Sequence, residues 1–349
     1  MIEIWYAILS FMLAMFVVLE GLDIGAGMLQ YLVGKTDKER RMVIAAIGPL
    51  WSWHEVWLVG FGGTLMVAFP KILAVSFSGF YLALFLLLWV LVLRGVSIEV
   101  SGHLSDPLWR TAWHFVFTFA NILLAILIGA ALGNLLRGVP LDSTGNFSLA
   151  FFTNFEPNGN VGILDWFTVS ASLFTFITFA AHGANALALK TEGPVHSRSL
   201  RTAKRLWKII PVLLAVLTFE SWKVRPELFS NLSQKPLVWF ASIIVLAGLI
   251  AIITGLKKDH CLRAVLGSCA FIAGLMASCA AGVFPTMLYS TLSPTNSLSA
   301  YQNASTSYSL AVALVWWPIA LVLAIGYFIF IYRHYTGKVA ALDDTQSPY

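Results

Sequence analysis

The 349-residue chain is 58% hydrophobic and only 11% charged, and its mean hydropathy is +0.80. These values exclude an ordinary soluble globular protein, because a soluble core cannot cover that much apolar surface. The net charge of +5 comes largely from basic loops between apolar runs, so it indicates membrane topology and no nucleic-acid partner.

Nine apolar runs long enough to cross a bilayer follow one another along the chain. They lie at about 4–26, 49–69, 72–93, 111–136, 164–189, 206–222, 236–256, 262–289 and 309–332. Each is expected to be a helix, because lipid offers exposed backbone groups no partner and the alternating pattern of a β-barrel is absent. The sequence therefore predicts an all-α polytopic membrane protein with about nine transmembrane helices.

Basic residues are divided unevenly between the loops. If the N-terminus lies outside, 17 of the 22 Lys and Arg residues fall on the cytoplasmic side. This imbalance predicts an odd number of helices and a cytoplasmic C-terminus. No basic segment precedes the first run, so we expect that run to be retained as a helix and not cleaved as a signal peptide.

The connection over residues 141–163 is rich in Gly, Asn, Pro and Phe and contains no apolar run. It is expected to be an outer loop between a first four-helix bundle, over 1–140, and a second part over 164–349. That second part is predicted to hold another four-helix bundle, one peripheral helix and a short cytoplasmic tail. A weak echo between GAGMLQYLVGKTD, from Gly25, and GANALALKTEG, from Gly183, leaves both an internal duplication and chance open.

Ionisable residues inside membrane helices are costly to bury, so each is a candidate for function. Glu20 and Asp23 are three residues apart, on one face of the first helix near its cytoplasmic third. Ser52 and Glu55 share a face at the start of the second helix, and His54 lies beside them. The short connection between the two helices predicts that these side chains form one polar cluster.

Two interpretations of this cluster stay open. It either handles protons or ions, or acts as a hydrogen-bonded clamp whose acids pair with Arg40, Arg41 or Arg94. A solute or ion transporter that uses the cluster of Glu20, Asp23 and Glu55 is an alternative function. However, a secondary transporter is expected to have broken helices and polar groups near the bilayer midplane, whereas the charges here lie toward one face.

Haem ligation is a further use of buried histidines. All seven histidines fall at or beyond the cytoplasmic ends of the runs: His54, His103, His114, His182, His196, His260 and His334. No run carries two histidines about four turns apart, as a transmembrane pair of bis-histidine haems requires. The three cysteines have no metal-site spacing and are expected to be packing residues. We therefore predict no cofactor or metal ligand in this chain.

Several motifs, in order, resemble subunit II of cytochrome bd quinol oxidases. They are LEGLDIGAGML (19–29), TDKERRMVIAAIGPLW (36–51), HEVWLVGFGGTLMVAFP (54–70), FSGFYLAL (77–84), LRGVSIE (93–99), GNLLRGVPL (133–141) and HGANALALKTEG (182–193). The resemblance covers about the first 200 residues. The last third is similar in hydropathy and helix number, with GVFPTMLYS (282–290) as its one familiar stretch.

The resemblance implies one subunit of a heterodimeric oxidase in the bacterial inner membrane, surrounded by lipid and with small accessory subunits in some complexes. Such oxidases oxidise quinol, reduce oxygen to water and take the chemical protons from the cytoplasm. It also implies that haem b, haem d and the quinol site belong to subunit I. Subunit II supports that partner, can hold a structural quinone and is thought to contribute a proton path, so the isolated chain is expected to be inactive.

Two positions depart from the family pattern. The family usually reads Trp-Asp-Gly-Asn after the Gly-Pro pair, where this chain has Trp-Ser-Trp-His, so Ser52 replaces an acid often tied to the proton path. His114 likewise stands where an acid is common. A serine hydroxyl relays a proton only as a hydrogen-bonded link. The proton role is therefore expected to pass to His54, Glu55 and ordered water, or to leave this subunit.

Overall fold

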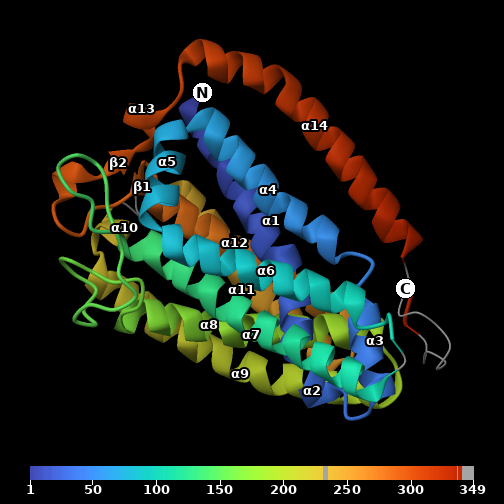
Figure 1. Ribbon diagram of the computed structural model, residues 1–349. Coiled ribbons are helices and arrows are strands. Elements are labelled where there is room, and N and C mark those ends of the chain that lie inside the picture. Colours follow the sequence, from blue (N-terminus) through green and yellow to red (C-terminus); the bar gives the residue numbers. More distant parts are fainter. Residues whose placement is uncertain (105, 231–234, 336, 340–349) are drawn as a thin grey trace.

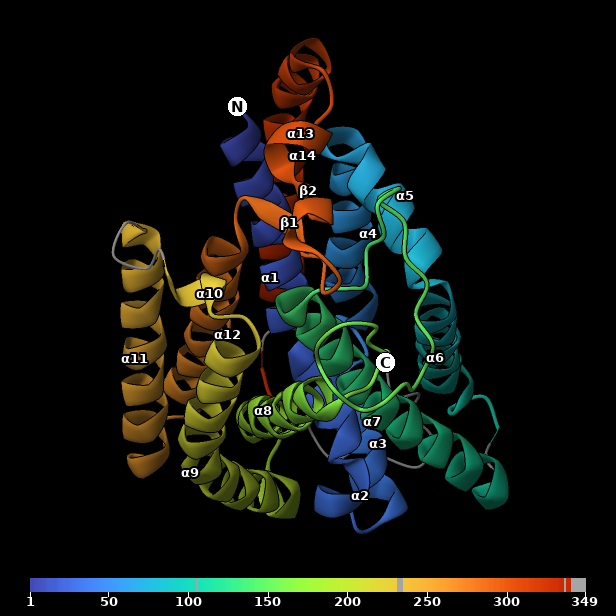
Figure 2. The same cartoon turned by 90° about the vertical axis from the view of Figure 1, so that its left-hand side faces the viewer.

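A computed structural model describes residues 1–104, 106–230, 235–335 and 337–339, and nearly all of its regular structure is helical (Figures 1 and 2). The first half contains α1 (Ile2–Met28), α2 (Gln30–Val33), α3 (Asp37–Ile47), α4 (Trp51–Ala68), α5 (Pro70–Gly79), α6 (Tyr81–Val100) and α7 (Pro107–Arg137). The second contains α8 (Trp166–Lys190), α9 (Gly193–Val224), α10 (Glu227–Ser230), α11 (Pro236–Lys257), α12 (Cys261–Val283), β1 (Thr286–Leu288), a 3-10 turn (Pro294–Asn296), β2 (Leu298–Ser299), α13 (Ala300–Asn303) and α14 (Ser307–His334). The predicted all-α class is confirmed.

Within the described residues, seven helices are long and apolar enough to cross a membrane, namely α1, α6, α7, α8, α11, α12 and α14. The pair α3 and α4, bent by 44°, makes an eighth if it is one span. The apolar part of α9 is flanked by Lys208 and Glu220 and is not among them. The chain is thus a polytopic membrane protein, but the predicted number of nine spans is not confirmed.

The third run differs from its predicted bounds of 72–93. The helix ends at Gly79 and restarts at Tyr81, and α6 then continues to Val100. The ring of Phe147, from the outer loop, fills the space that a Cβ at position 79 would need, so a larger residue there would displace that ring. Glycine also weakens a helix, which favours a break at this point. The shift places Arg94 well inside α6 instead of near the end of a span.

Local sequence signals set several helix ends. At the start of α3, the Thr36 hydroxyl accepts from the Glu39 N–H, and the Glu39 carboxylate accepts from the Thr36 N–H. Asp165 caps α8, because its side chain accepts hydrogen bonds from the backbone N–H groups of Phe167, at 2.8 Å, and Thr168, at 2.9 Å. Such reciprocal caps satisfy amides that have no partner within the helix. Asp165 also pairs with buried Arg137 at the end of α7, which closes the outer loop between the two halves.

Helices α1, α4, α6 and α7 of the first half are called the first group, and α8, α9, α11 and α12 of the second half the second group. The groups pack on each other through α7 with α8 and α1 with α8, and α14 lies along the outside (Figures 1 and 2). Only 6% of the most apolar stretch of α14 is buried, which agrees with the predicted peripheral helix. Helix α14 begins near the N-terminus and runs along the outside of the molecule (Figure 1). The proposed division at residues 141–163 stays a prediction, as does the orientation in the membrane.

The two groups meet where α1 crosses α8. A Cβ added at Gly25 would collide with the backbone carbonyl of Phe179, and one added at Gly183 would collide with the backbone of Gly25 and Ala26. The two helices therefore touch backbone to backbone, which requires glycine on both sides. This crossing holds the polar end of α1 at the centre of the molecule.

Candidate functional site: a buried cluster around Arg94

A buried polar cluster lies between α1, α4 and α6. Glu20 and Asp23 come from α1, His54 and Glu55 from α4, and Arg94 from α6. Glu20 and Arg94 are fully buried, Asp23 and His54 are almost so, and Glu55 is at the edge. The structure thus brings together four of the residues singled out in the sequence and adds an arginine at their centre.

Arg94 is the only cation that is certain to be charged among these five residues. Its Nη1 donates to Glu20 Oε1 and, at 3.1 Å, to Glu55 Oε1. Its Nη2 lies 3.9 Å from Asp23 Oδ2. One guanidinium therefore faces three carboxyl groups, which come from two different helices.

His54 extends the cluster toward α14. Its Nδ1 lies 2.6 Å from Asp23 Oδ2 and its Nε2 lies 2.9 Å from the Tyr332 hydroxyl. An ionised carboxylate only accepts, so Nδ1 carries a hydrogen and donates to Asp23. In the neutral imidazole, Nε2 then accepts the hydrogen of the Tyr332 hydroxyl. Both ring nitrogens are engaged.

The charges of the cluster do not balance when all three carboxyl groups are ionised. An uncompensated buried charge is so costly that the group binds a proton instead. Glu20 Oε2 is buried and has no hydrogen-bond partner among the described residues, which makes it one place for such a proton. The arrangement can therefore hold at least one exchangeable proton beside Arg94.

Metal binding is the other chemistry open to two acids and a histidine. Ligand atoms of Glu20, Asp23 and His54 lie within 4.8 Å of one another. However, His54 Nδ1 and Asp23 Oδ2 are only 2.6 Å apart, whereas two ligands about 2.0–2.2 Å from one tetrahedral ion are separated by about 3.4 Å. Arg94 already occupies the position of a cation between the acids. The contacts are those of a hydrogen-bond network.

Ser52 and His114, also predicted as part of this site, lie elsewhere. Ser52 is exposed. It is two residues before buried His54, which places it about 200° away around the axis of α4. His114 is buried in α7, where its Nδ1 lies 3.7 Å from Asp37 Oδ1. Asp37 in turn pairs with Arg110 at 3.2 Å. The contacts around Arg94 therefore include neither Ser52 nor His114, and a role for them in this site stays a prediction.

Another histidine, His182 of α8, links three helices. Its Nε2 lies 3.0 Å from the Val18 carbonyl of α1, and its Nδ1 lies 2.7 Å from the Ser268 hydroxyl of α12. Because both nitrogens are engaged in a fully buried position, this side chain serves packing between the two groups of helices.

Tyr332 was missed by sequence reasoning, and Arg94 was considered only as one of three basic partners of the acids. Arg94 was placed near the end of a span, and only the shift of α6 to Val100 encloses it. The motif LRGVSIE was a signal that pointed to this arginine. Tyr332 is far from every acid in sequence and belongs to no recognisable motif, so nothing in the sequence connected it with His54.

Comparisons with known proteins agree over almost the whole chain. The family model described as cytochrome bd terminal oxidase subunit II matches residues 1–335. A probable cytochrome oxidase subunit 2 of Haemophilus influenzae is 28% identical, over 97% of this chain and 95% of its own. The cytochrome bd-I ubiquinol oxidase subunit 2 of Escherichia coli is 27% identical, over 97% and 95%. A chain in the structure of bd oxidase from Geobacillus thermodenitrificans has the same fold, with a TM-score of 0.74, 15% identity and coverage of 96% and 98%.

Proposed function

This chain belongs to the family of cytochrome bd terminal oxidase subunit II, and we propose that it is the non-haem-ligating subunit of a quinol:oxygen oxidoreductase of the bacterial inner membrane. It is therefore a subunit of an oxidoreductase complex and an integral membrane protein. The family match argues against the transporter alternative. Quinol and oxygen are the proposed substrates of the complex.

In this proposal, haem b and haem d are held by subunit I, and this chain supports that partner and can hold a structural quinone. Two of its three buried histidines support the division. His54 and His182 each have both ring nitrogens in hydrogen bonds, so neither has a nitrogen free for haem iron in this arrangement. The bound haems would supply the electron-transfer and oxygen chemistry.

The proposed role of this chain in turnover is to conduct protons from the cytoplasm toward the site of oxygen reduction. The observation that carries it is Arg94, buried among Glu20, Asp23 and Glu55. Their excess acid groups bind and release protons, while the guanidinium keeps the remaining negative charge stable. With the N-terminus outside and the C-terminus in the cytoplasm, the cluster lies toward the cytoplasmic side. The clamp interpretation is the competing role.

A reduced-minus-oxidised optical spectrum of the complex purified through this chain tests the oxidase assignment. Co-purified haem d bands are expected, and they should persist when His54, His114 or His182 is replaced by Ala, one at a time. A stable complex without haem would refute the oxidase assignment. Loss of one band from an assembled variant would show that this chain provides a ligand.

Turnover of Glu55→Gln separates the proton path from the clamp. The amide keeps the shape and accepts from Arg94 but cannot release a proton, so a proton path predicts slower quinol oxidation with normal assembly and haem content. A clamp predicts less assembled complex with undiminished turnover of what remains. Glu99→Gln is the matched control, because Glu99 is an exposed acid on α6 outside the cluster.

A further inference from the structure

We propose that Tyr332 of α14 is the group that passes cytoplasmic protons to His54, and that a water-accessible pocket beside Leu50 feeds it. This role rests on the proton path proposed for Glu20, Asp23 and Glu55. It assigns α14, the helix that is least buried, a place in the chemistry of the complex.

Two hydrogen bonds join Tyr332 to His54 and His54 to Asp23, and Arg94 lies beyond them. Tyr332 is 37% exposed, whereas His54, 2.9 Å from its hydroxyl, is 1% exposed. Asp23 follows at 2.6 Å from the other ring nitrogen, and Arg94 Nη2 at 3.9 Å from the same carboxylate oxygen. The Tyr332 hydroxyl thus links the buried pair His54 and Asp23 to a partly exposed residue of α14.

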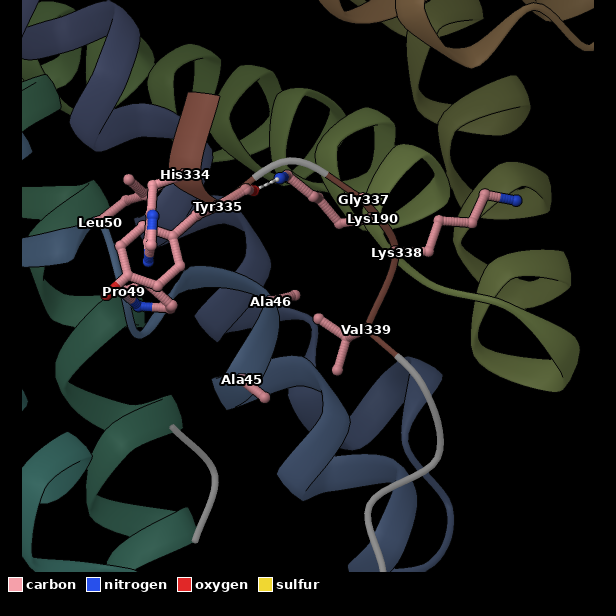
Figure 3. Close-up of a pocket in the computed structure, with 10 residues that line it drawn as sticks. All are labelled: Ala45, Ala46, Pro49, Leu50, Lys190, His334, Tyr335, Gly337, Lys338 and Val339. Atoms are coloured by element: carbon pink, nitrogen blue, oxygen red, sulfur yellow. Dashed lines mark hydrogen bonds between the residues drawn. The ribbon is translucent and has the colours of Figure 1, made fainter. Parts of the chain in front are cut away.

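A pocket of about 200 Å³ lies at the same end of α4 (Figure 3). Pro49 and Leu50 line one side of the pocket. His334 and Tyr335, which are two and three residues after Tyr332, line another side. The Leu50 carbonyl accepts from the backbone N–H of His54 at 3.2 Å, so the pocket borders the first turn of α4. This volume has room for several water molecules.

The segment that encloses the pocket is fixed to the main body. Lys190 Nζ donates to the Tyr335 carbonyl at 2.9 Å, an interaction that Figure 3 shows as a dashed line. The Val339 N–H donates to the Lys190 carbonyl at 2.8 Å. Tyr335 and Val339 are therefore held beside α8 while the end of α14 lies over α4.

The proton transfers balance as follows. A protonated water that reaches Tyr332 from the pocket gives a proton to the Tyr332 oxygen and is left as neutral water, while the hydroxyl proton passes to His54 Nε2. The Nδ1 proton then passes to Asp23 Oδ2, and the imidazole is left neutral with its hydrogen on Nε2. Rotation of the ring and of the hydroxyl restores the starting tautomer. One proton has entered the cluster, and no net charge remains on Tyr332 or His54.

The hydroxyl is separable from the packing of α14. Tyr327 packs at a tilt against Trp53 with ring centroids 4.5 Å apart, and Phe328 packs against Trp57 at 5.6 Å. These contacts attach α14 to α4 through rings alone. Removing one hydroxyl therefore leaves the main attachment of the helix unchanged.

Tyr332→Phe in the complete oxidase is the test, with Tyr327→Phe on the same helix as the matched control. We expect turnover of Tyr332→Phe to fall roughly 10- to 100-fold, at or below the low end for a positioned proton-transfer group. Haem content should be unchanged, and Tyr327→Phe should behave as the wild type. Normal turnover of assembled Tyr332→Phe would overturn the proposal.

A second variant keeps the test informative if Tyr332→Phe assembles poorly. A fluorinated tyrosine at position 332 keeps the ring and the hydroxyl but makes the hydroxyl more acidic, so the pH profile of turnover should shift. An unshifted profile would overturn the role of Tyr332. Glu55→Gln distinguishes the two proposals, because slow Glu55→Gln with normal Tyr332→Phe refutes only Tyr332, whereas normal turnover of both refutes the path itself.

Discussion

Replacing Arg94 by Gln should strongly destabilise the chain. Arg94 is fully buried and donates to Glu20 and Glu55, and its second terminal nitrogen faces Asp23. Removing one partner of a buried ion pair costs about 3–5 kcal/mol, because the other charge is left uncompensated. Here the acids can bind protons instead, so we expect the low end, about 3 kcal/mol at neutral pH.

The loss is measured as the free energy of unfolding in mixed detergent, with Arg201→Gln as the control, since Arg201 is an exposed cation on α9. Combining Arg94→Gln with Glu20→Gln removes both partners. The loss in the free energy of unfolding of the double variant should be smaller than the sum of the two single losses by at least about 1 kcal/mol, as expected for coupled neighbours. Additive effects, or an Arg94→Gln variant as stable as the wild type, would refute the view that the guanidinium holds the acids together.

Three further changes test other parts of the structure. Gly183→Val should lower the free energy of unfolding by well over 1 kcal/mol, because the new side chain would meet the backbone at Gly25, which cannot move aside as a side chain can. Melting at the wild-type temperature would contradict the close crossing. Ser52→Asp should leave turnover unchanged, because position 52 is exposed and faces away from His54, and a clear rate change would show a water link between them. A reporter that is active only outside the membrane, fused after residue 338, should give no signal, and a strong signal would reverse the proposed orientation.

The helical class and most helix positions follow from the sequence because apolar length is a local property. The runs at 111–136 and 236–256 lie within α7 and α11. The run at 72–93 was wrong in its bounds, because the helix breaks after Gly79, where the ring of Phe147 from a distant loop packs against it. A contact with so distant a residue leaves no periodic signal in the sequence.

The candidate site was predictable only in part for the same reason. Glu20 and Asp23 are three residues apart, so their common face is set by helix geometry alone. Ser52 shares a face of α4 with Glu55 by its spacing but is exposed, whereas the residue buried at this end of α4 is His54. The contact of His54 with Tyr332 spans 278 residues, and no local pattern encodes it.

The most direct test of the central claim is transient proton uptake by the assembled oxidase during one reaction with oxygen, measured for the wild type and for Asp23→Asn. Asp23 contacts His54 and faces Arg94, so every route through the cluster that starts at His54 includes it. Proton uptake by Asp23→Asn should be slowed at least about tenfold, with haem content unchanged. Uptake at the wild-type rate in a fully assembled variant would contradict a proton path through this chain.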